Sequence, residues 1–447
     1  MPSLTTWIGF TVLNLAILWQ FLLKNIVFNS FGYGRVLQPL SDFPYTCRRV
    51  TDHNIAACED AWIDDKSRQL FLACSNALGR KAWNPTMASY AADRRPQHDQ
   101  VVVMSLDTPH PQDPQSFDYR ILDFGDYTNA IGEKQLNLLG MTGRTLKDGT
   151  INLYFVSQAP TFDLTTQVPT DQAVTGHNAT IEAFSMSPDS STLKHLYTFY
   201  NPTNITTPNN VAVRPDDSIV ITNDHGPYRS GLGHTLSTVL GTGSIAHCIP
   251  PPDKNSIAPC SLIAKSERHH FPNGLHVSPK DTLLYVPSSL TGEVSVYSSP
   301  FRYENIPQNG FRPFKDADHL HNTTQEHPIH KVGSIPLNMP LDNISEDSDG
   351  VMLVAGFPKL PQVEEHLKES TPIDGRSIAA TILEIRRVGE PGKGFGMPKR
   401  EWTVKKILED PKGEILPMTT TAVRDAKTGR LFIMGVVSPW IAVCDPK

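Results

Sequence analysis

The chain has 447 residues, a formal net charge of -6 and a sequence pI near 6.2. No basic stripe or block of like charge interrupts this balance, so nucleic acid is not expected as a partner. Charged residues make up only 19%, while proline (37) and glycine (29) are frequent. Short apolar runs separated by turn residues predict strands and loops rather than long helices. The length fits two or three ordinary domains, or one large domain built from repeats.

The first 24 residues differ from everything that follows. The stretch Leu4–Leu23 carries no charge and, at about 20 residues, is long enough to cross a bilayer as a helix. A cleaved signal peptide is the alternative, but no basic region precedes the apolar run and no clear small-x-small site follows it. We therefore expect an uncleaved signal-anchor or transmembrane helix over residues 1–24. By the positive-inside tendency, Lys24 after the apolar run argues against the orientation that places the rest of the chain in the lumen or outside the cell. Residues 25–46 are expected to form a linker or short helix.

The six cysteines form no C-x-x-C pattern, so a thiolate zinc site is not expected. Cys47 and Cys444 lie at opposite ends of the expected domain, where a disulfide would tie its first strand to its last. Cys248 and Cys260 flank a proline-rich loop and can pair locally. Glycosylation sequons begin at Asn178, Asn204 and Asn322. Together with the N-terminal segment, these features predict a secretory-pathway protein, either membrane-anchored with a lumenal or extracellular body, or secreted.

Strand-like apolar runs recur along the rest of the chain, each after a turn signal. They cover residues 69–73, 151–156, 218–221, 283–286, 352–355 and 431–434. Their spacing of roughly 65 to 85 residues leaves room for about four strands and a loop, the content of one propeller blade. A β-sandwich or two smaller all-β domains are alternatives. Even spacing and the possible end-to-end disulfide favour a closed ring, and we predict an all-β, six-bladed β-propeller over residues 47–447.

Three longer segments interrupt this pattern and are predicted to be loops. Residues 226–262 are rich in glycine, proline and serine. Residues 302–330 contain four histidines beside a sequon; a zinc site is the alternative to a solvated loop, which we favour because the segment is very polar. These histidines are His319, His321, His327 and His330. The glycine-rich residues 392–396 lack the strand-to-helix context of a phosphate-binding loop.

Oxygen-bearing side chains recur just before short apolar strands. They are Glu59, Asp60, Asn209, Asn210, Asn273, Asp342 and Asn343. Each one alone is typical of a turn. Calcium takes six to eight oxygen ligands, and the inner strand of every propeller blade starts near the central axis. Donors placed at the same phase of four blades therefore predict a calcium site. Asn343-Ile-Ser is a fourth sequon match, but a buried metal ligand could not carry a glycan.

At these motifs the chain resembles the serum paraoxonase/arylesterase family of six-bladed calcium propellers. The resemblance covers most of residues 44–447, closely at the motifs and loosely in the loops. It rests on the segments Cys58-Glu59-Asp60, Pro208-Asn209-Asn210, Thr222-Asn223-Asp224-His225, Phe271-Pro272-Asn273 and Leu341-Asp342-Asn343. The pair Cys47 and Cys444 is similar to the family's terminal disulfide, and the uncut N-terminus is similar to its retained signal sequence.

The resemblance implies two calcium ions and a hydrolase that acts on small ester or lactone substrates. The implied ligands of a catalytic ion are Glu59, Asn209, Asn273, Asp342 and Asn343. The implied ligands of a structural ion are Asp60, the carbonyl of Met141 and Asn210. The family has an aspartate where this chain has Asn210, which removes one negative charge and should weaken the structural ion.

A second departure concerns catalysis. The two histidines often given the general-base role in the family align with Leu139 and Gln158, neither of which can act as a base near neutral pH. Asp342 is the best replacement as nucleophile or base. His225 is a second candidate, because an imidazole titrates in the working range; its alternative role is that of a hydrogen-bonded histidine in the cavity wall.

The predicted function is therefore calcium-dependent hydrolysis of esters or lactones, with the bound ion stabilising the oxyanion that develops. The alternative is a calcium-stabilised propeller without catalysis that binds a lipid or protein partner. A propeller similar to strictosidine synthase would share the architecture but not the five matched oxygen donors. The membrane is expected as a partner through the N-terminal helix.

Overall fold

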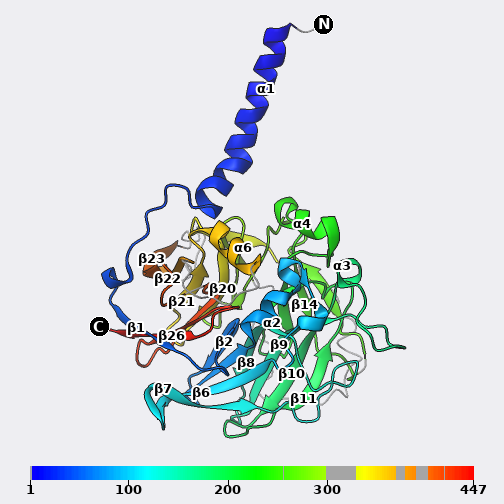
Figure 1. Ribbon diagram of the computed structural model, residues 1–447, viewed down its shortest axis with the longest axis vertical. Helices are drawn as coiled ribbons and strands as arrows, with labels where there is room; N and C mark the ends of the chain where they lie inside the picture. Colours follow the sequence, from blue (N-terminus) through cyan, green and yellow to red (C-terminus); the bar gives the residue numbers. More distant parts are fainter. Residues whose placement is uncertain (1–2, 255, 299–328, 369–377, 389–400, 417) are drawn as a thin grey trace, which may run out of the picture.

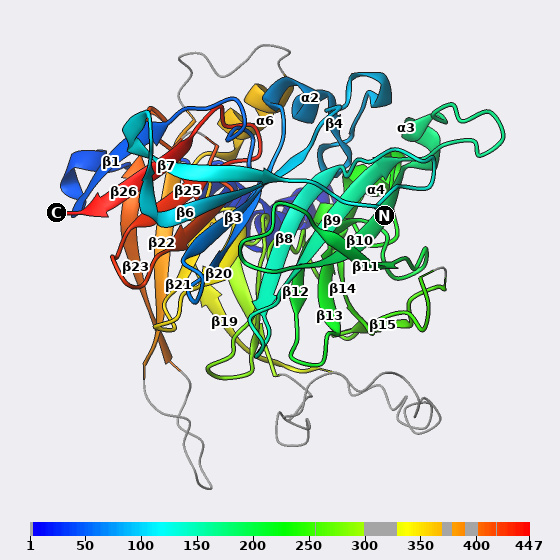
Figure 2. The same cartoon turned by 90° about the horizontal axis from the view of Figure 1, so that it is seen from below.

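Six four-stranded antiparallel sheets form the blades of a propeller (Figures 1 and 2). The computed structural model describes the chain except for residues 1–2, 255, 299–328, 369–377, 389–400 and 417. The first three blades are, from the axis outward, β2 (Asp60–Asp64), β3 (Gln69–Cys74), β6 (Gln100–His110) and β7 (Asp113–Leu122); β8 (Leu138–Thr145), β9 (Ile151–Pro160), β10 (His177–Met186) and β11 (Lys194–Phe199); and β12 (Pro208–Val213), β13 (Ile219–Asn223), β14 (Ser244–Cys248) and β15 (Cys260–Ile263).

The other three blades follow in chain order. They are β16 (His276–Val277), β17 (Leu284–Pro287), β18 (Glu293–Tyr297) and β19 (Lys331–Pro336); β20 (Leu341–Glu346), β21 (Met352–Gly356), β22 (Ala380–Val388) and β23 (Glu401–Asp410); and β24 (Thr421–Arg424), β25 (Leu431–Met434), β26 (Ile441–Pro446) and β1 (Tyr45–Val50). Each inner strand contacts the next, from β2 through β8, β12, β16, β20 and β24 back to β2. The prediction of a closed six-bladed propeller is confirmed.

Apolar side chains between neighbouring blades form the core. The six predicted apolar runs are the second strands of the six blades, and these strands are covered on both faces. In β3, Leu70 and Leu72 pack against Phe432 of the last blade, while Phe71 packs against Phe184 of the next blade. Similar clusters fill the other four interfaces. Burying each such side chain contributes about 1.5–3 kcal/mol.

The first and last parts of the propeller close the ring together. Strand β1 pairs antiparallel with β26, and Cys47 lies opposite Cys444 and forms the predicted disulfide with it. The local pairing of Cys248 with Cys260, which the sequence left open, is also present. A third disulfide, Cys58–Cys74, joins the residues before β2 to the end of β3; the spacing of the cysteines did not identify it.

In the part of the chain that the structure describes, few helices accompany the sheets. They are α1 (Leu4–Leu18), α2 (Ala77–Ala82), α3 (Gln172–Thr175), α4 (Gly231–Leu240) and α6 (Leu360–Lys368), with single 3-10 turns at Leu40–Asp42, Pro85–Met87 and Ala92–Arg94 and a small hairpin of β4 (Trp83–Asn84) and β5 (Ser89–Tyr90). Residues 226–262, predicted to be a loop, instead contain α4, β14 and β15. The prediction was wrong because glycine and proline frame these short elements, while Leu232, Leu236 and Leu240 recur at helical spacing.

The N-terminal segment projects from the propeller (Figure 1). Helix α1 gives way to π-helical turns at Trp19–Leu23 and Ile26–Ser30. Among the described residues, no helix is both long and apolar enough to span a bilayer. The predicted linker is held against the propeller, because Arg35 donates to the backbone carbonyls of Pro358 and Asn338. Membrane anchorage through residues 1–24 stays a prediction.

The Cys47–Cys444 disulfide should dominate the covalent stabilisation of the ring. It spans 397 residues, whereas Cys248–Cys260 spans 12, and in the chain-entropy model a longer closed loop restricts the unfolded chain more. We expect the double variant Cys47→Ser/Cys444→Ser to lose about 2–5 kcal/mol of unfolding free energy. Denaturant unfolding without reductant should show a clearly smaller loss for Cys248→Ser/Cys260→Ser, and equal losses would contradict this account.

Candidate metal centre

The inner strands bring the predicted oxygen donors together at the axis. Glu59 precedes β2, Asn209 and Asn210 lie in β12, Asn273 precedes β16, and Asp342 and Asn343 lie in β20. All seven predicted side chains, Asp60 included, are at most 7% exposed. The ladders of β12 and β20 shift register at Pro208/Asn210 and Leu341/Ile344. Such bulges change the direction in which side chains point, and here they occur at residues predicted to ligate the metal.

A chain of hydrogen bonds links predicted ligands from four blades. The Asn343 Nδ2 donates to Glu59 Oε1 at 2.9 Å, and the Asn210 Nδ2 donates to Asn343 Oδ1 at 2.7 Å and to Asp60 Oδ2 at 3.0 Å. The backbone N–H of Met141 also donates to Asp60 Oδ2, at 2.9 Å. The structure therefore gathers Glu59, Asp60, Met141, Asn210 and Asn343 in one network.

Three buried oxygens at this centre have no hydrogen-bond partner among the described residues. They are Glu59 Oε2, Asn209 Oδ1 and Asn273 Oδ1. The amide nitrogens of both asparagines are engaged elsewhere: Asn209 Nδ2 donates to Asp224 Oδ2 at 3.3 Å and Asn273 Nδ2 to Ser289 Oγ at 2.9 Å. These bonds orient the amides and leave their oxygens open. A buried unpaired oxygen costs about 1–3 kcal/mol, so three together call for a ligand.

Buried carboxyl groups add an unbalanced negative charge. Burial, followed by the charges of Asp60 and Asp342, raises the pKa of Glu59 well above its usual range. Burial and then the Asp60 charge likewise raise the pKa of Asp342, and burial raises the pKa of Asp60 to about 6. A cation at this centre would offset both the desolvation and the mutual repulsion of the carboxylates.

The first predicted ligand set fits calcium by its donor chemistry. Glu59, Asn209, Asn273, Asp342 and Asn343 present only carboxylate and amide oxygens, the ligands that calcium prefers. Asn343 Oδ1 accepts from Asn210 Nδ2 in this arrangement, so the open oxygens of the set are those of Glu59, Asn209 and Asn273. Among the described residues, no three His, Cys, Asp or Glu side chains cluster closely enough to hold a metal by themselves, so the amides are essential to this fit.

The second predicted set is internally satisfied. Asp60 Oδ1 accepts from the backbone N–H of Ala61 at 2.8 Å and from Thr421 Oγ1 at 3.2 Å, and its Oδ2 accepts from Asn210 and Met141. Asn210 Oδ1 accepts from the backbone N–H of Val211. Because N–H donors already surround Asp60, these side chains do not fit a second ion in this arrangement.

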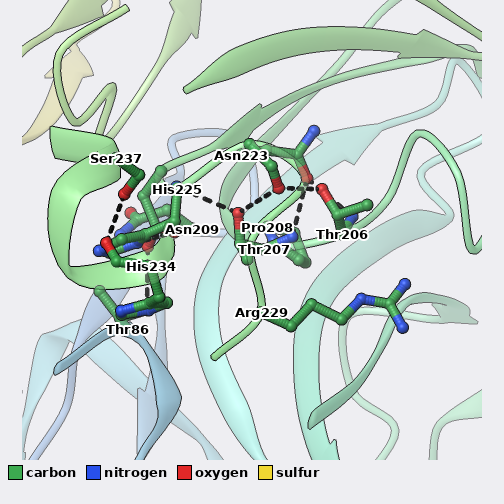
Figure 3. Close-up of polar contacts among 12 residues, drawn as sticks. Thr86, Thr206, Thr207, Pro208, Asn209, Asn223, His225, Arg229, His234 and Ser237 are labelled. Carbon is green, nitrogen blue, oxygen red and sulfur yellow. Dashed lines mark hydrogen bonds and ion pairs between the residues drawn. The ribbon is translucent and has the colours of Figure 1, made fainter. Parts of the chain in front are cut away.

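A histidine cluster adjoins the first set (Figure 3). Asp224 Oδ1 lies 2.7 Å from His225 Nδ1, and the His225 ring stacks on His234 with centroids 3.6 Å apart. Although burial alone would raise it, the His225 charge and hydrogen bond lower the pKa of Asp224. Thr86 Oγ1 donates to Asp224 Oδ2 at 2.9 Å, the oxygen that also accepts from Asn209. One carboxylate thus connects His225 with a candidate ligand.

Leu139 and Gln158, the two positions aligned with histidines in the sequence analysis, have different surroundings. Leu139 is buried in the core between the second and third blades. The Gln158 Nε2 donates to the Pro208 carbonyl at 2.8 Å and to Thr86 Oγ1 at 3.3 Å. Gln158 therefore holds the first residue of β12 in place. It also contacts Thr86, which in turn donates to Asp224.

The other predicted sites lie apart from the centre. Asn178 lines a pocket on the second blade, and Asn204 donates to the Cys260 carbonyl at 3.0 Å. His330 is exposed, as expected for a solvated loop. Asn322, the glycine-rich residues 392–396 and the other three loop histidines, His319, His321 and His327, fall outside the described residues.

Sequence reasoning missed Thr86, His177 and His234. They come from three separate elements, the 3-10 turn at Pro85–Met87, the start of β10 and α4, and no spacing in the sequence links them. His234 lies on α4, inside the segment predicted to be a loop.

No family model and no curated protein matches the chain. Solved structures resemble it at low identity. A gluconolactonase from Xanthomonas campestris is 14% identical, with 92% of this chain and 94% of that one covered and a TM-score of 0.41. A functionally unknown protein from Desulfotomaculum acetoxidans is 10% identical, with 92% and 98% covered and a TM-score of 0.38. Similarity at this level is too low to transfer an activity.

Acid should destabilise the fold through His177. This residue is 1% exposed, neither ring nitrogen has a partner among the described residues, and burial, followed by Arg229, lowers its pKa to about 3. An unfolded histidine has a pKa of about 6.5. Between these values the unfolded chain binds a proton that the folded chain does not, so stability falls as the pH falls.

Unfolding measured between pH 7 and pH 4 should therefore show a weaker loss in His177→Leu than in the wild type. His53→Gln, at a side chain that is 89% exposed, is the control and should keep the wild-type profile. An unchanged profile in His177→Leu would refute this linkage.

Proposed function

We propose that this protein is a calcium-dependent hydrolase of lactones or esters. The observation that carries the proposal is the set of three buried, unpartnered oxygens, Glu59 Oε2, Asn209 Oδ1 and Asn273 Oδ1, grouped with the buried Asp342 at the axis. A propeller that only needed stability would satisfy these oxygens internally. Open oxygens beside like charges are instead the features of a cation site.

One ion is proposed, held by Glu59, Asn209, Asn273, Asp342 and Asn343. When bound, calcium supplies a positive charge that polarises a carbonyl or phosphoryl oxygen and stabilises the developing oxyanion. The structural ion implied by the family resemblance is not part of the proposal, because the hydrogen bonds around Asp60 occupy its oxygens.

Asp342 is the proposed attacking group, directly or through a water molecule that it deprotonates. It is 7% exposed and next in the chain to Asn343, which is hydrogen-bonded to Glu59. His225 is the second proton acceptor of the site. Its Nδ1 lies 2.7 Å from Asp224 Oδ1, a contact that fixes the orientation of the ring.

The three disulfides support a body that folds in an oxidising compartment. We propose the secretory pathway, with residues 1–24 as the membrane anchor or signal. The alternative function is a calcium-stabilised binding propeller, and Leu139 and Gln158 in place of two histidines favour it. The two functions share the ion and differ in turnover.

Replacing Asp342 should separate these functions. In Asp342→Asn at saturating calcium, we expect turnover of lactones and aryl esters to fall by about 10²–10⁴, the usual contribution of a positioned acid–base group. Chelator should abolish wild-type turnover. Asp349→Asn, at a side chain that is 59% exposed, is the matched control and should keep wild-type rates.

Calcium content measured on the same samples distinguishes lost chemistry from lost metal. Full turnover in Asp342→Asn with calcium bound would remove Asp342 from the mechanism. Bound calcium without turnover of any lactone or ester in the wild type would favour the binding propeller.

A further inference from the structure

A cavity separate from the candidate metal centre lies on the blade of β8–β11, away from the axis. Its volume is about 460 Å³, and it shares no residue with the candidate metal centre. Strands β9 and β10 form much of its wall, with residues 127–131 of the preceding connection on another side. The volume falls in the range of sites that enclose a small ligand.

Asn178, the acceptor of an Asn-Ala-Thr sequon, lies in the wall of this cavity together with Thr180 of the same sequon. Strand β10 pairs with β9 from His177 onwards, but with β11 only from Ile181. One edge of residues 177–180 is therefore open beside the acceptor. The Asn178 side chain is half-buried and makes no hydrogen bond within the described part of the chain.

The interior of the cavity suits a neutral, hydroxyl-rich occupant, because its one basic lining residue, Lys254, is exposed to solvent. Its one carboxylate, Glu182, is 2% exposed and already accepts from Thr180 Oγ1 at 2.7 Å and Thr198 Oγ1 at 2.6 Å, with His195 Nε2 at 3.1 Å. A carboxylate saturated in this way does not call for a cation or a basic ligand.

The other walls offer hydroxyls and aromatic rings. Ser157, Phe162 and Tyr200 line the cavity, and Tyr200 is 38% exposed. Hydroxyl groups exchange hydrogen bonds with a sugar, and aromatic rings cover its apolar faces.

We propose that Asn178 carries an N-linked glycan whose first sugar is seated in this cavity. Attachment joins the Asn178 Nδ2 to the anomeric carbon of a lipid-linked oligosaccharide, the co-substrate. The bond from that carbon to the lipid diphosphate breaks, the diphosphate leaves with the electron pair, and the amide nitrogen loses one proton. A sequon glycan usually projects from a surface loop; here the acceptor already forms part of a cavity wall.

Asn204 provides a comparison within the same chain. Its side chain donates to the Cys260 carbonyl and does not line the cavity beside Asn178. A sugar attached there would have no seat of this kind.

The full chain, expressed in a eukaryotic host and purified from its membranes or medium, provides the test. Glycopeptide mass spectrometry should find Asn178 occupied in the wild type, and Asn178→Gln or Thr180→Ala should lose one glycan. Peptide-N-glycosidase should release the Asn178 glycan on the order of tenfold more slowly from native than from denatured protein, because release requires local opening. Tyr200→Ala keeps the sequon and should speed release from the native protein. Asn204→Gln, the control, should leave the Asn178 glycan and its slow native release unchanged.

Two results would overturn the proposal. One is an unmodified Asn178 in the wild type purified from that host, whether or not other sequons are occupied. The other is equally fast release of its glycan from native and denatured protein. Both are read from the wild type, so failure of a variant to fold leaves the test intact. Neither depends on calcium or on hydrolysis.

Discussion

Closure of the ring is the constraint on which the rest of the structure depends. Strand β1 completes the last blade, and Cys47–Cys444 holds it there. Arg68 strengthens the same junction through paired contacts of 2.6 and 2.7 Å to the buried Asp425. Only in a closed ring do six inner strands meet, and only then do Glu59 and Asn343, 284 residues apart, come within hydrogen-bond distance.

The fold could be predicted because each blade repeats one physical pattern. Its second strand is covered on both faces and must be apolar throughout, so the runs at 69–73 and 431–434 stand out in the sequence. Residues 226–262 did not follow the pattern, because short elements framed by glycine and proline resemble a loop. The Cys58–Cys74 pair was missed because six cysteines allow 15 pairings.

The candidate site could be predicted only in part. The recurrence of oxygen-bearing side chains just before apolar strands singled out Glu59, Asn209, Asn273 and Asp342 as candidate ligands. What the sequence could not reveal is which oxygens stay open: Asn209 and Asn210 are adjacent, yet the Oδ1 of the first is unpartnered and that of the second is satisfied. The Asn210 oxygen accepts from the backbone N–H of Val211, whereas the Asn209 amide is oriented by its bond to Asp224. The stacking of His225 on His234 likewise depends on how α4 folds back onto the end of β13.

The central claim is that the open oxygens at the axis hold one calcium ion. Equilibrium dialysis of the purified, chelator-stripped protein against calcium, with elemental analysis of the bound metal, tests it most directly. The account predicts one tightly bound ion per chain, and weakened binding in Glu59→Gln. A chain that binds no calcium, or binds it equally well without the Glu59 charge, would contradict the account.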